Sequence, residues 1–181
     1  MKDPVVQIGA KVLSERALPV GKMDIGSPKL KALIKKMKDT LTKEEFGVAL
    51  AAPQIGSALR MFVIAGKAFK GEKDDEPEDA PAPEDKVFIN PELVKLSRAK
   101  REMSEGCLSV RGKYGTVMRH EKASVRALDE DGKAFTYNGN GLVAHIFQHE
   151  VDHLNGILYV DKAIKLEDDS ERDALREKHP A

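Results

Sequence analysis

Three of the five histidines in this 181-residue chain, His145, His149 and His153, lie within nine residues of one another. If this segment is a helix, side chains four residues apart lie one turn apart on the same face. His149 and His153 enclose Glu150 in the pattern H-E-x-x-H, in which two imidazoles bind a metal ion and the glutamate acts as a general base on a water molecule. The pattern favours metal-dependent hydrolysis. The same five letters are also compatible with two ordinary histidines beside a helix-favouring glutamate.

A tetrahedral catalytic metal site needs a third protein ligand and one open position. His145 is not expected to be that ligand, because it lies a full turn before His149 and one ion reaches two successive turns more easily than three. The single cysteine, Cys107, is the natural candidate, since a thiolate is a soft, charged ligand for transition metals. Taken alone, a free cysteine is more often a small buried hydrophobic residue. Both interpretations of Cys107 stay open at this point.

The composition excludes several other classes of protein. At about 150 residues per domain, the chain forms one domain, and its 41% hydrophobic residues are enough for a core. The 30 basic and 30 acidic residues cancel, which argues against a protein that coats nucleic acid. One cysteine allows no internal disulfide, and no apolar stretch reaches signal-peptide length or the ~20 residues that cross a bilayer. We expect a single catalytic domain over residues 1–165 in the cytoplasm, with no nucleic-acid motif and no membrane association.

Two helices are expected to position the candidate residues. Ser27 can cap the first, and Pro28 suits its first turn because proline lacks an N–H that would be unpaired there. Asn140 is expected to cap the second helix, which carries the three histidines to about residue 155 and stops at Gly156. Apolar residues recur at helical spacing in the first helix, at Leu30, Leu33, Ile34, Met37 and Leu41.

The other apolar segments predict strands. Residues 61–64, 87–89 and 157–160 are short apolar runs, and residues 98–137 have the pattern of antiparallel sheet, with Asp131-Gly132 as a tight turn. Residues 71–86 form an acidic insertion with three prolines that buries too little apolar surface to become ordered, so we expect it to be mobile. Residues 166–181 form a mixed-charge C-terminal tail. The predicted fold is α+β, with antiparallel sheets around a central helix that carries H-E-x-x-H, and an N-terminal helix.

Three segments occur in the chain in a fixed order: G-V-A-L-A-A-P-Q at residues 47–54, E-G-C-L-S at 105–109 and Q-H-E-V-D-H at 148–153. They resemble the three signature motifs of the peptide deformylases, and I-N-P at 89–91 and H-L-N-G at 153–156 match as well. The resemblance covers residues 5–163. It implies the family's fold, with a central metal-binding helix. It also implies the family's activity, removal of the N-formyl group from the initiator methionine of newly made polypeptides with release of formate.

The resemblance further implies a cofactor, partners and catalytic roles. The cofactor is one divalent metal ion, usually Fe²⁺ in the family, with Zn²⁺, Ni²⁺ or Co²⁺ as substitutes. The partners are N-formyl-methionyl nascent peptides at the ribosome. The implied metal ligands are Cys107, His149 and His153, and the implied catalytic carboxylate is Glu150. The implied oxyanion hole consists of the Gln54 amide and the backbone N–H of Leu108.

Substrate binding is expected along the first motif, where backbone groups of Val48 and Ala49 would pair with an extended peptide. Glu105 is expected to support the site by pairing with Arg119, the alternative being an unpaired surface arginine. The residues that the resemblance assigns to a methionine pocket are Val48, Leu142, His145 and Ile146, with Gly106 and Leu108 near the metal. Of these, Leu142 and Ile146 also suit plain core packing.

Three positions depart from the family pattern. Ala49 replaces a glycine, Arg111 stands where bacterial members commonly have proline, and His145 stands where an apolar residue is common. Because none of them is an implied metal ligand or the catalytic carboxylate, they bear on specificity more than on activity. Three alternatives stay open: an H-E-x-x-H endopeptidase, a non-catalytic binding module that keeps the fold, and a relative that acts on another N-acyl substrate.

Overall fold

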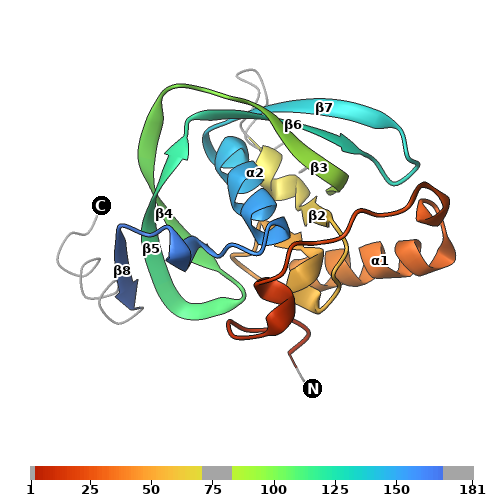
Figure 1. The fold of residues 1–181 in the computed structure, drawn as a ribbon, viewed down its shortest axis with the longest axis horizontal. Coiled ribbons are helices and arrows are strands. Elements are labelled where there is room, and N and C mark those ends of the chain that lie inside the picture. Colours follow the sequence, from red (N-terminus) through yellow and green to blue (C-terminus); the bar gives the residue numbers. More distant parts are fainter. Residues whose placement is uncertain (1–2, 71–82, 169–181) are drawn as a thin grey trace.

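The computed structural model describes residues 3–70 and 83–168, which form an α+β fold of two antiparallel sheets and two α-helices (Figure 1). Within these residues, no helix is both long and apolar enough to span a membrane. The larger sheet contains, in spatial order, β1 (Ala49–Ala51), β2 (Met61–Ile64), β3 (Lys86–Leu96), β6 (Lys122–Leu128) and β7 (Ala134–Asn140). The smaller sheet contains β4 (Lys100–Cys107), β5 (Val110–His120) and β8 (Lys165–Asp168).

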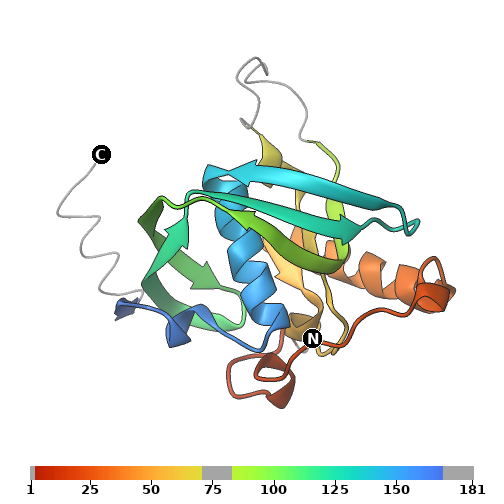
Figure 2. The same ribbon diagram turned by 45° about the horizontal axis from the view of Figure 1, so that its top comes forward.

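The second helix, α2 (Gly141–Leu154), runs between the two sheets, as the views in Figures 1 and 2 both show. Its buried face meets the larger sheet through aromatic contacts, with the Phe147 and Phe88 rings 5.3 Å apart and edge-on. The other side of α2 faces β4 and β5, which carry the cysteine motif. The histidine-bearing helix is therefore held at the centre of the fold.

The first helix, α1 (Pro28–Thr42), covers the opposite face of the larger sheet. Successive side chains of a strand point to opposite faces of the sheet. In β2, Phe62 and Ile64 therefore pack in the hydrophobic cluster beneath α2, whereas Met61 and Val63 pack in the cluster beneath α1. With both faces covered, β2 is apolar at every position. The predicted start of α1 is confirmed, because the Ser27 hydroxyl accepts a hydrogen bond from the Leu30 N–H at 3.2 Å.

The predicted hairpin and the end of the second helix are also confirmed. Strands β6 and β7 pair in antiparallel register around residues 129–133, and Gly156 takes the left-handed conformation, with φ +74°, just after α2. The capping role expected for Asn140 is wrong. Asn140 precedes α2, but its side chain makes no capping hydrogen bond, because its backbone is still paired with Lys122 as the last residue of β7.

The strand expected at residues 157–160 is wrong as well. This segment instead forms a short 3-10 helix, Tyr159–Asp161. The Asp161 carboxylate accepts the Leu158 N–H at 2.8 Å, and the buried Tyr159 hydroxyl donates to the Lys113 carbonyl at 2.8 Å. A local side-chain bond therefore replaces the sheet pairing that apolar residues alone suggest.

Two predicted segments fall wholly or partly on residues that the structure does not describe. Of the acidic insertion at 71–86, residues 71–82 lie outside the described residues. Of the C-terminal tail at 166–181, residues 169–181 lie outside them. The first tail residues belong to β8, which pairs with β5 and extends the smaller sheet past residue 165.

Candidate active site

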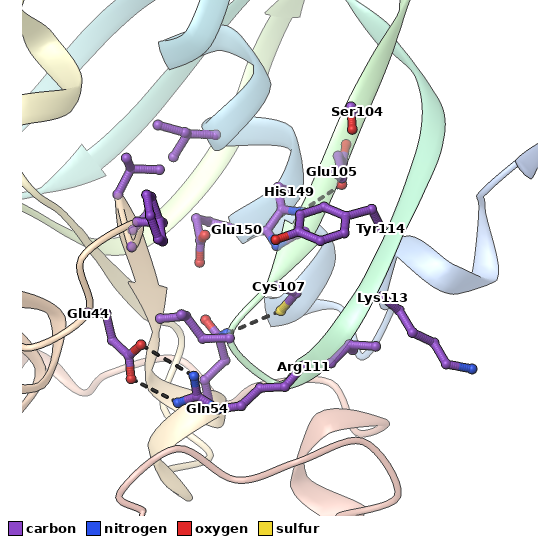
Figure 3. Close-up of a pocket in the computed structure, with 18 of the residues that line it drawn as sticks. Glu44, Gln54, Ser104, Glu105, Cys107, Arg111, Lys113, Tyr114, His149 and Glu150 are labelled. Atoms are coloured by element: carbon purple, nitrogen blue, oxygen red, sulfur yellow. Dashed lines mark hydrogen bonds and ion pairs between the residues drawn. The ribbon is translucent and has the colours of Figure 1, made fainter. Parts of the chain in front are cut away.

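A cavity of about 790 Å³ lies between α2, β1 and the hairpin formed by β4 and β5 (Figure 3). All three sequence motifs contribute to its wall. His153 and Arg119 are among the predicted site residues but do not line it; both are buried. The predicted site residues that line the cavity are Val48, Ala49, Gln54, Glu105, Gly106, Cys107, Leu108, Leu142, His145, Ile146, His149 and Glu150.

The three candidate metal ligands converge. One donor atom from each of Cys107, His149 and His153 lies within 4.8 Å of the other two, and the Cys107 Sγ is 3.2 Å from His153 Nε2. Sulfur and nitrogen ligands of one tetrahedral ion would be about 3.5 Å apart, given metal–ligand distances of about 2.3 and 2.0 Å. His145 does not belong to this cluster. One thiol and two imidazoles therefore fit a single transition-metal ion.

Glu150, the residue after His149, reaches the cavity but is deeply buried. Its Oε2 atom is a buried polar atom without a hydrogen-bond partner among the described residues. Burial raises the pKa of Glu150 to about 7, the Glu105 charge adds to the rise, and His149 opposes it. A pKa near 7 suits a group that must both accept and return a proton at neutral pH.

The Gln54 side chain is oriented by the backbone. Gln54 lies on the 3-10 turn that follows β1, and its Oε1 accepts the Ala51 N–H at 2.8 Å. Its Nε2 is therefore the end that points into the site, 3.4 Å from Cys107 Sγ and 3.3 Å from Ser109 Oγ. This arrangement presents a neutral hydrogen-bond donor beside the thiol, and such a donor can stabilise a negative charge that develops on a substrate oxygen.

A buried ion-pair network supports the histidines. Arg119 Nε lies 2.6 Å from Glu105 Oε1, so the expected pair is present and the unpaired surface arginine is wrong. The same carboxylate meets His145 Nε2 at 2.8 Å and His149 Nδ1 at 2.7 Å. Burial alone would raise the pKa of Glu105, but these hydrogen bonds and that of Arg119 outweigh it and lower the pKa. The contact to Nδ1 leaves Nε2 of His149 free to face Cys107.

Sequence reasoning missed the second half of this network. Arg119 Nη1 also contacts Asp152 Oδ2 at 2.6 Å, and Lys162 Nζ contacts Asp152 Oδ1 at 2.6 Å. A second missed residue is Gln148, which exchanges hydrogen bonds of 2.9 Å with the backbone N–H and C=O of His120 at the end of β5. A polar side chain on a buried helix needs a partner. The sequence therefore indicates that Gln148 has a hydrogen-bond partner, but it does not indicate which residue that partner is.

Gly106 lies at a position where a larger side chain would not fit. Tyr114 lies across it from β5, and a Cβ atom at Gly106 would come within 2.8 Å of a Tyr114 ring carbon. Figure 3 shows the Tyr114 ring at the cavity near His149. Tyr114 is a further lining residue that the motifs did not indicate.

Replacing Arg119 with methionine should lower the free energy of unfolding by about 3 kcal/mol, because two buried carboxylates then lose a cation. Urea denaturation of the metal-loaded protein measures this change. The matched control is Arg126→Met, which removes an exposed pair with Glu92 and should change stability by about 0.5 kcal/mol or less. Equal effects of the two substitutions would contradict a structural role for the buried network.

A helix that carries H-E-x-x-H beside a cysteine from a strand hairpin, inside an α+β fold, defines the class of mononuclear metallohydrolases. The comparisons with known proteins agree with that class and narrow it. The sequence model described as "Polypeptide deformylase" matches residues 2–169. The chain belongs to the polypeptide deformylase family.

Named relatives support this membership. The chain is 38% identical to the peptide deformylase of Halothermothrix orenii, over 90% of this chain and 96% of that protein. It is 40% identical to that of Carboxydothermus hydrogenoformans, over 88% of this chain and 91% of that protein. Among solved structures, a peptide deformylase from Legionella pneumophila superposes with TM-score 0.74 at 39% identity, covering 96% of this chain and 90% of that one. A Met-Ala-Ser-bound class I type b peptide deformylase from Acinetobacter baumannii gives TM-score 0.76 at 34% identity, covering 90% and 98%.

Proposed function

We propose that this chain removes the N-formyl group from the initiator methionine of newly made polypeptides and releases formate. The observation that carries this proposal is the convergence of three metal-ligand candidates, a buried glutamate and an oriented glutamine amide on one cavity. These are the groups that hydrolysis of an unactivated amide needs. Because the substrates are nascent chains, we place the reaction at the ribosome, in the cytoplasm.

We propose that Cys107, His149 and His153 hold one divalent ion, Fe²⁺ in the cell, with Zn²⁺, Ni²⁺ or Co²⁺ as substitutes. When bound, such an ion supplies Lewis-acid activation and lowers the pKa of water toward ~7. Glu105 hydrogen-bonds Nδ1 of His149 and so fixes the orientation of this ring, and Arg119 holds Glu105 in place. The chain's own side chains carry out the proton transfers.

The proposed proton path uses Glu150. Its carboxylate accepts a proton from the attacking water as the water oxygen bonds to the formyl carbon, and then delivers that proton to the amine nitrogen as the C–N bond breaks. The Gln54 amide and the Leu108 N–H donate to the formyl oxygen while it carries negative charge. The products are formate and a polypeptide whose N-terminal methionine has a free amino group.

The proposed peptide site is the exposed edge of β1. This strand ends the larger sheet and, in the part of the chain that the structure describes, pairs only with β2. The Val48 carbonyl already accepts the Ala65 N–H at 2.9 Å, so the backbone groups of the next residue, Ala49, are the ones placed on the outer side of the strand to pair with an extended substrate. The Met-Ala-Ser bound by the Acinetobacter relative is a peptide of this kind. The methionine side chain would enter the cavity beside the metal ligands, between Val48, Leu142, His145 and Ile146, next to Gly106.

Replacing His145 with isoleucine should leave the metal content unchanged, because His145 contacts Glu105 and is not a member of the donor cluster. Glu105 keeps Arg119 and His149 as partners. The pocket loses a polar group, so kcat/KM for formyl-norleucine peptides should rise relative to formyl-methionine peptides by about threefold. Metal analysis and competition between the two substrates measure both effects. Loss of the metal would show that His145 is a ligand after all.

The proposed function is tested by anaerobic metal analysis combined with formate release from formyl-Met-Ala-Ser. We expect one metal ion per chain and release of formate. Cleavage of an internally placed bond in a doubly blocked peptide would instead indicate an endopeptidase. Faster hydrolysis of acetyl-Met-Ala-Ser would indicate another N-acyl substrate, and metal binding without hydrolysis would indicate a non-catalytic module.

A further inference from the structure

Residues Asp3–Ile8, here called the N-terminal strap, contact both segments that carry the proposed oxyanion-hole donors. The Val6 N–H donates to the Gln54 carbonyl at 2.8 Å, and the Ile8 N–H donates to the Ser109 carbonyl at 2.8 Å. Gln54 supplies one donor through its side chain, and Ser109 directly follows the residue whose N–H is the other. The N-terminal strap therefore connects the segment that carries Gln54 to the segment that carries Leu108.

The side chain of Gln7 adds a third link. Its Nε2 atom donates to the Leu108 carbonyl at 3.0 Å and lies 3.3 Å from the Val5 carbonyl. The carbonyl and the N–H of Leu108 are separated by only two rotatable backbone bonds, so holding the carbonyl restricts the direction of the N–H. Gln7 is exposed, and an exposed hydrogen bond adds little to overall stability. Its effect should therefore be local.

Arg111 fixes the start of the strap. Its Nη2 atom lies 3.1 Å from Asp3 Oδ2 and 2.8 Å from Glu44 Oε1, and Asp3 Oδ1 accepts the Val5 N–H at 2.9 Å. Figure 3 shows Arg111 and Glu44 meeting at the cavity. The guanidinium thus ties the start of β5 both to the strap and to the segment that leads into β1. A proline at this position could make none of these contacts.

We propose that Gln7 and Arg111 are positioning residues, which act through the N-terminal strap to hold the Leu108 N–H in fixed relation to the Gln54 amide. This inference rests on the proposed function. Two donors stabilise a developing oxyanion only when both lie within hydrogen-bond distance of the same oxygen. A displacement of about 1 Å can lower the rate of an enzyme about 100-fold. Gln54 and Leu108 come from different elements, so their separation must be set by the contacts that join those elements.

Gln7→Met tests the proposal, because methionine keeps the length of the side chain and removes the donor. We expect kcat for formyl-Met-Ala-Ser to fall about tenfold while KM stays within about twofold, since the hole acts mainly on the transition state. Arg111→Met should also lower kcat. The matched controls are Ser14→Ala, which removes an exposed bond to the Lys11 carbonyl, and Arg126→Met; both should keep the wild-type kcat.

A double substitution separates positioning from a general structural role. If the strap sets the relation between the two donors, that relation no longer matters once the Gln54 donor is removed. In a Gln54→Ala background, Gln7→Met should therefore lower kcat less than about twofold. A tenfold loss that persists in this background would overturn the inference.

Amide hydrogen exchange supplies a readout that does not depend on activity. In the metal-loaded Gln7→Met variant without substrate, the amides of residues 108–111 should exchange about tenfold faster than in the wild type, whereas Ser14→Ala should leave them unchanged. Unchanged exchange at residues 108–111 would overturn the role of the strap even if the wild type is fully active. A wild type that binds metal but releases no formate would instead overturn the proposed function.

Discussion

Replacing Glu150 with glutamine is expected to lower turnover of formyl-Met-Ala-Ser at least ~100-fold while leaving the metal content unchanged. The loss follows from the proton path, because an amide can neither accept the proton of the attacking water nor deliver it to the leaving nitrogen. The substitution keeps the shape of a buried side chain, so packing in α2 should not change. Single-turnover formate release and metal analysis of the same preparation measure the two quantities together.

The control for this substitution is Glu92→Gln, which changes charge in the same way at an exposed position on β3. It should keep wild-type turnover. Near-normal turnover of Glu150→Gln would show that another group carries the proton, and the hydrolytic role assigned to Glu150 would be wrong. Loss of the metal in Glu150→Gln would show that this carboxylate helps to hold the ion.

The α-helices and most strands could be predicted because local signals dominate there. Ser27 and Pro28 fix the start of α1 by capping chemistry that operates within one turn. The spacing of His149 and His153 was enough to place two imidazoles on one helical face. The four apolar residues of β2 indicated a strand, but not that each face of it meets a different helix.

Long-range partners were harder to predict. The sequence indicates that Asp152 is a carboxylate on a buried helix, but its partner Arg119 is 33 residues away and Lys162 lies beyond the end of the helix. The error at residues 157–160 has a similar cause. Apolar composition favours a strand there, whereas the Asp161 carboxylate closes a local turn that composition does not reveal.

The positions that depart from the family pattern share a location. Ala49 lines the cavity at the edge strand, Arg111 bridges two segments at the cavity, and His145 hydrogen-bonds Glu105 beside the ligands. None of them supplies a candidate metal-donor atom. We therefore expect variation at Ala49 and His145 to change how a substrate is held, and variation at Arg111 to act through the N-terminal strap on the proposed oxyanion-hole donors.

Replacing Cys107 with alanine is expected to remove most of the bound metal and, with it, nearly all formate release. Two imidazoles alone form an incomplete site, since a catalytic tetrahedral centre uses three protein ligands. The thiol also lies 3.4 Å from Gln54 Nε2 and 3.2 Å from His153 Nε2, so its loss leaves a gap between a candidate metal ligand and a proposed oxyanion-hole donor. Anaerobic metal analysis after dialysis, with circular dichroism to confirm the fold, measures the effect.

Two comparisons give the Cys107 prediction its controls. Cys107→Asp restores an anionic ligand of different reach and should retain more metal than alanine, although turnover should stay low because the carboxylate is a harder donor than the thiolate. Ser104→Ala on the same strand, at an exposed position, should keep the wild-type metal content. Full occupancy in Cys107→Ala would remove the cysteine from the ligand set. The site would then depend on the two histidines and a ligand outside the three motifs, which the Cys107, His149 and His153 cluster does not support.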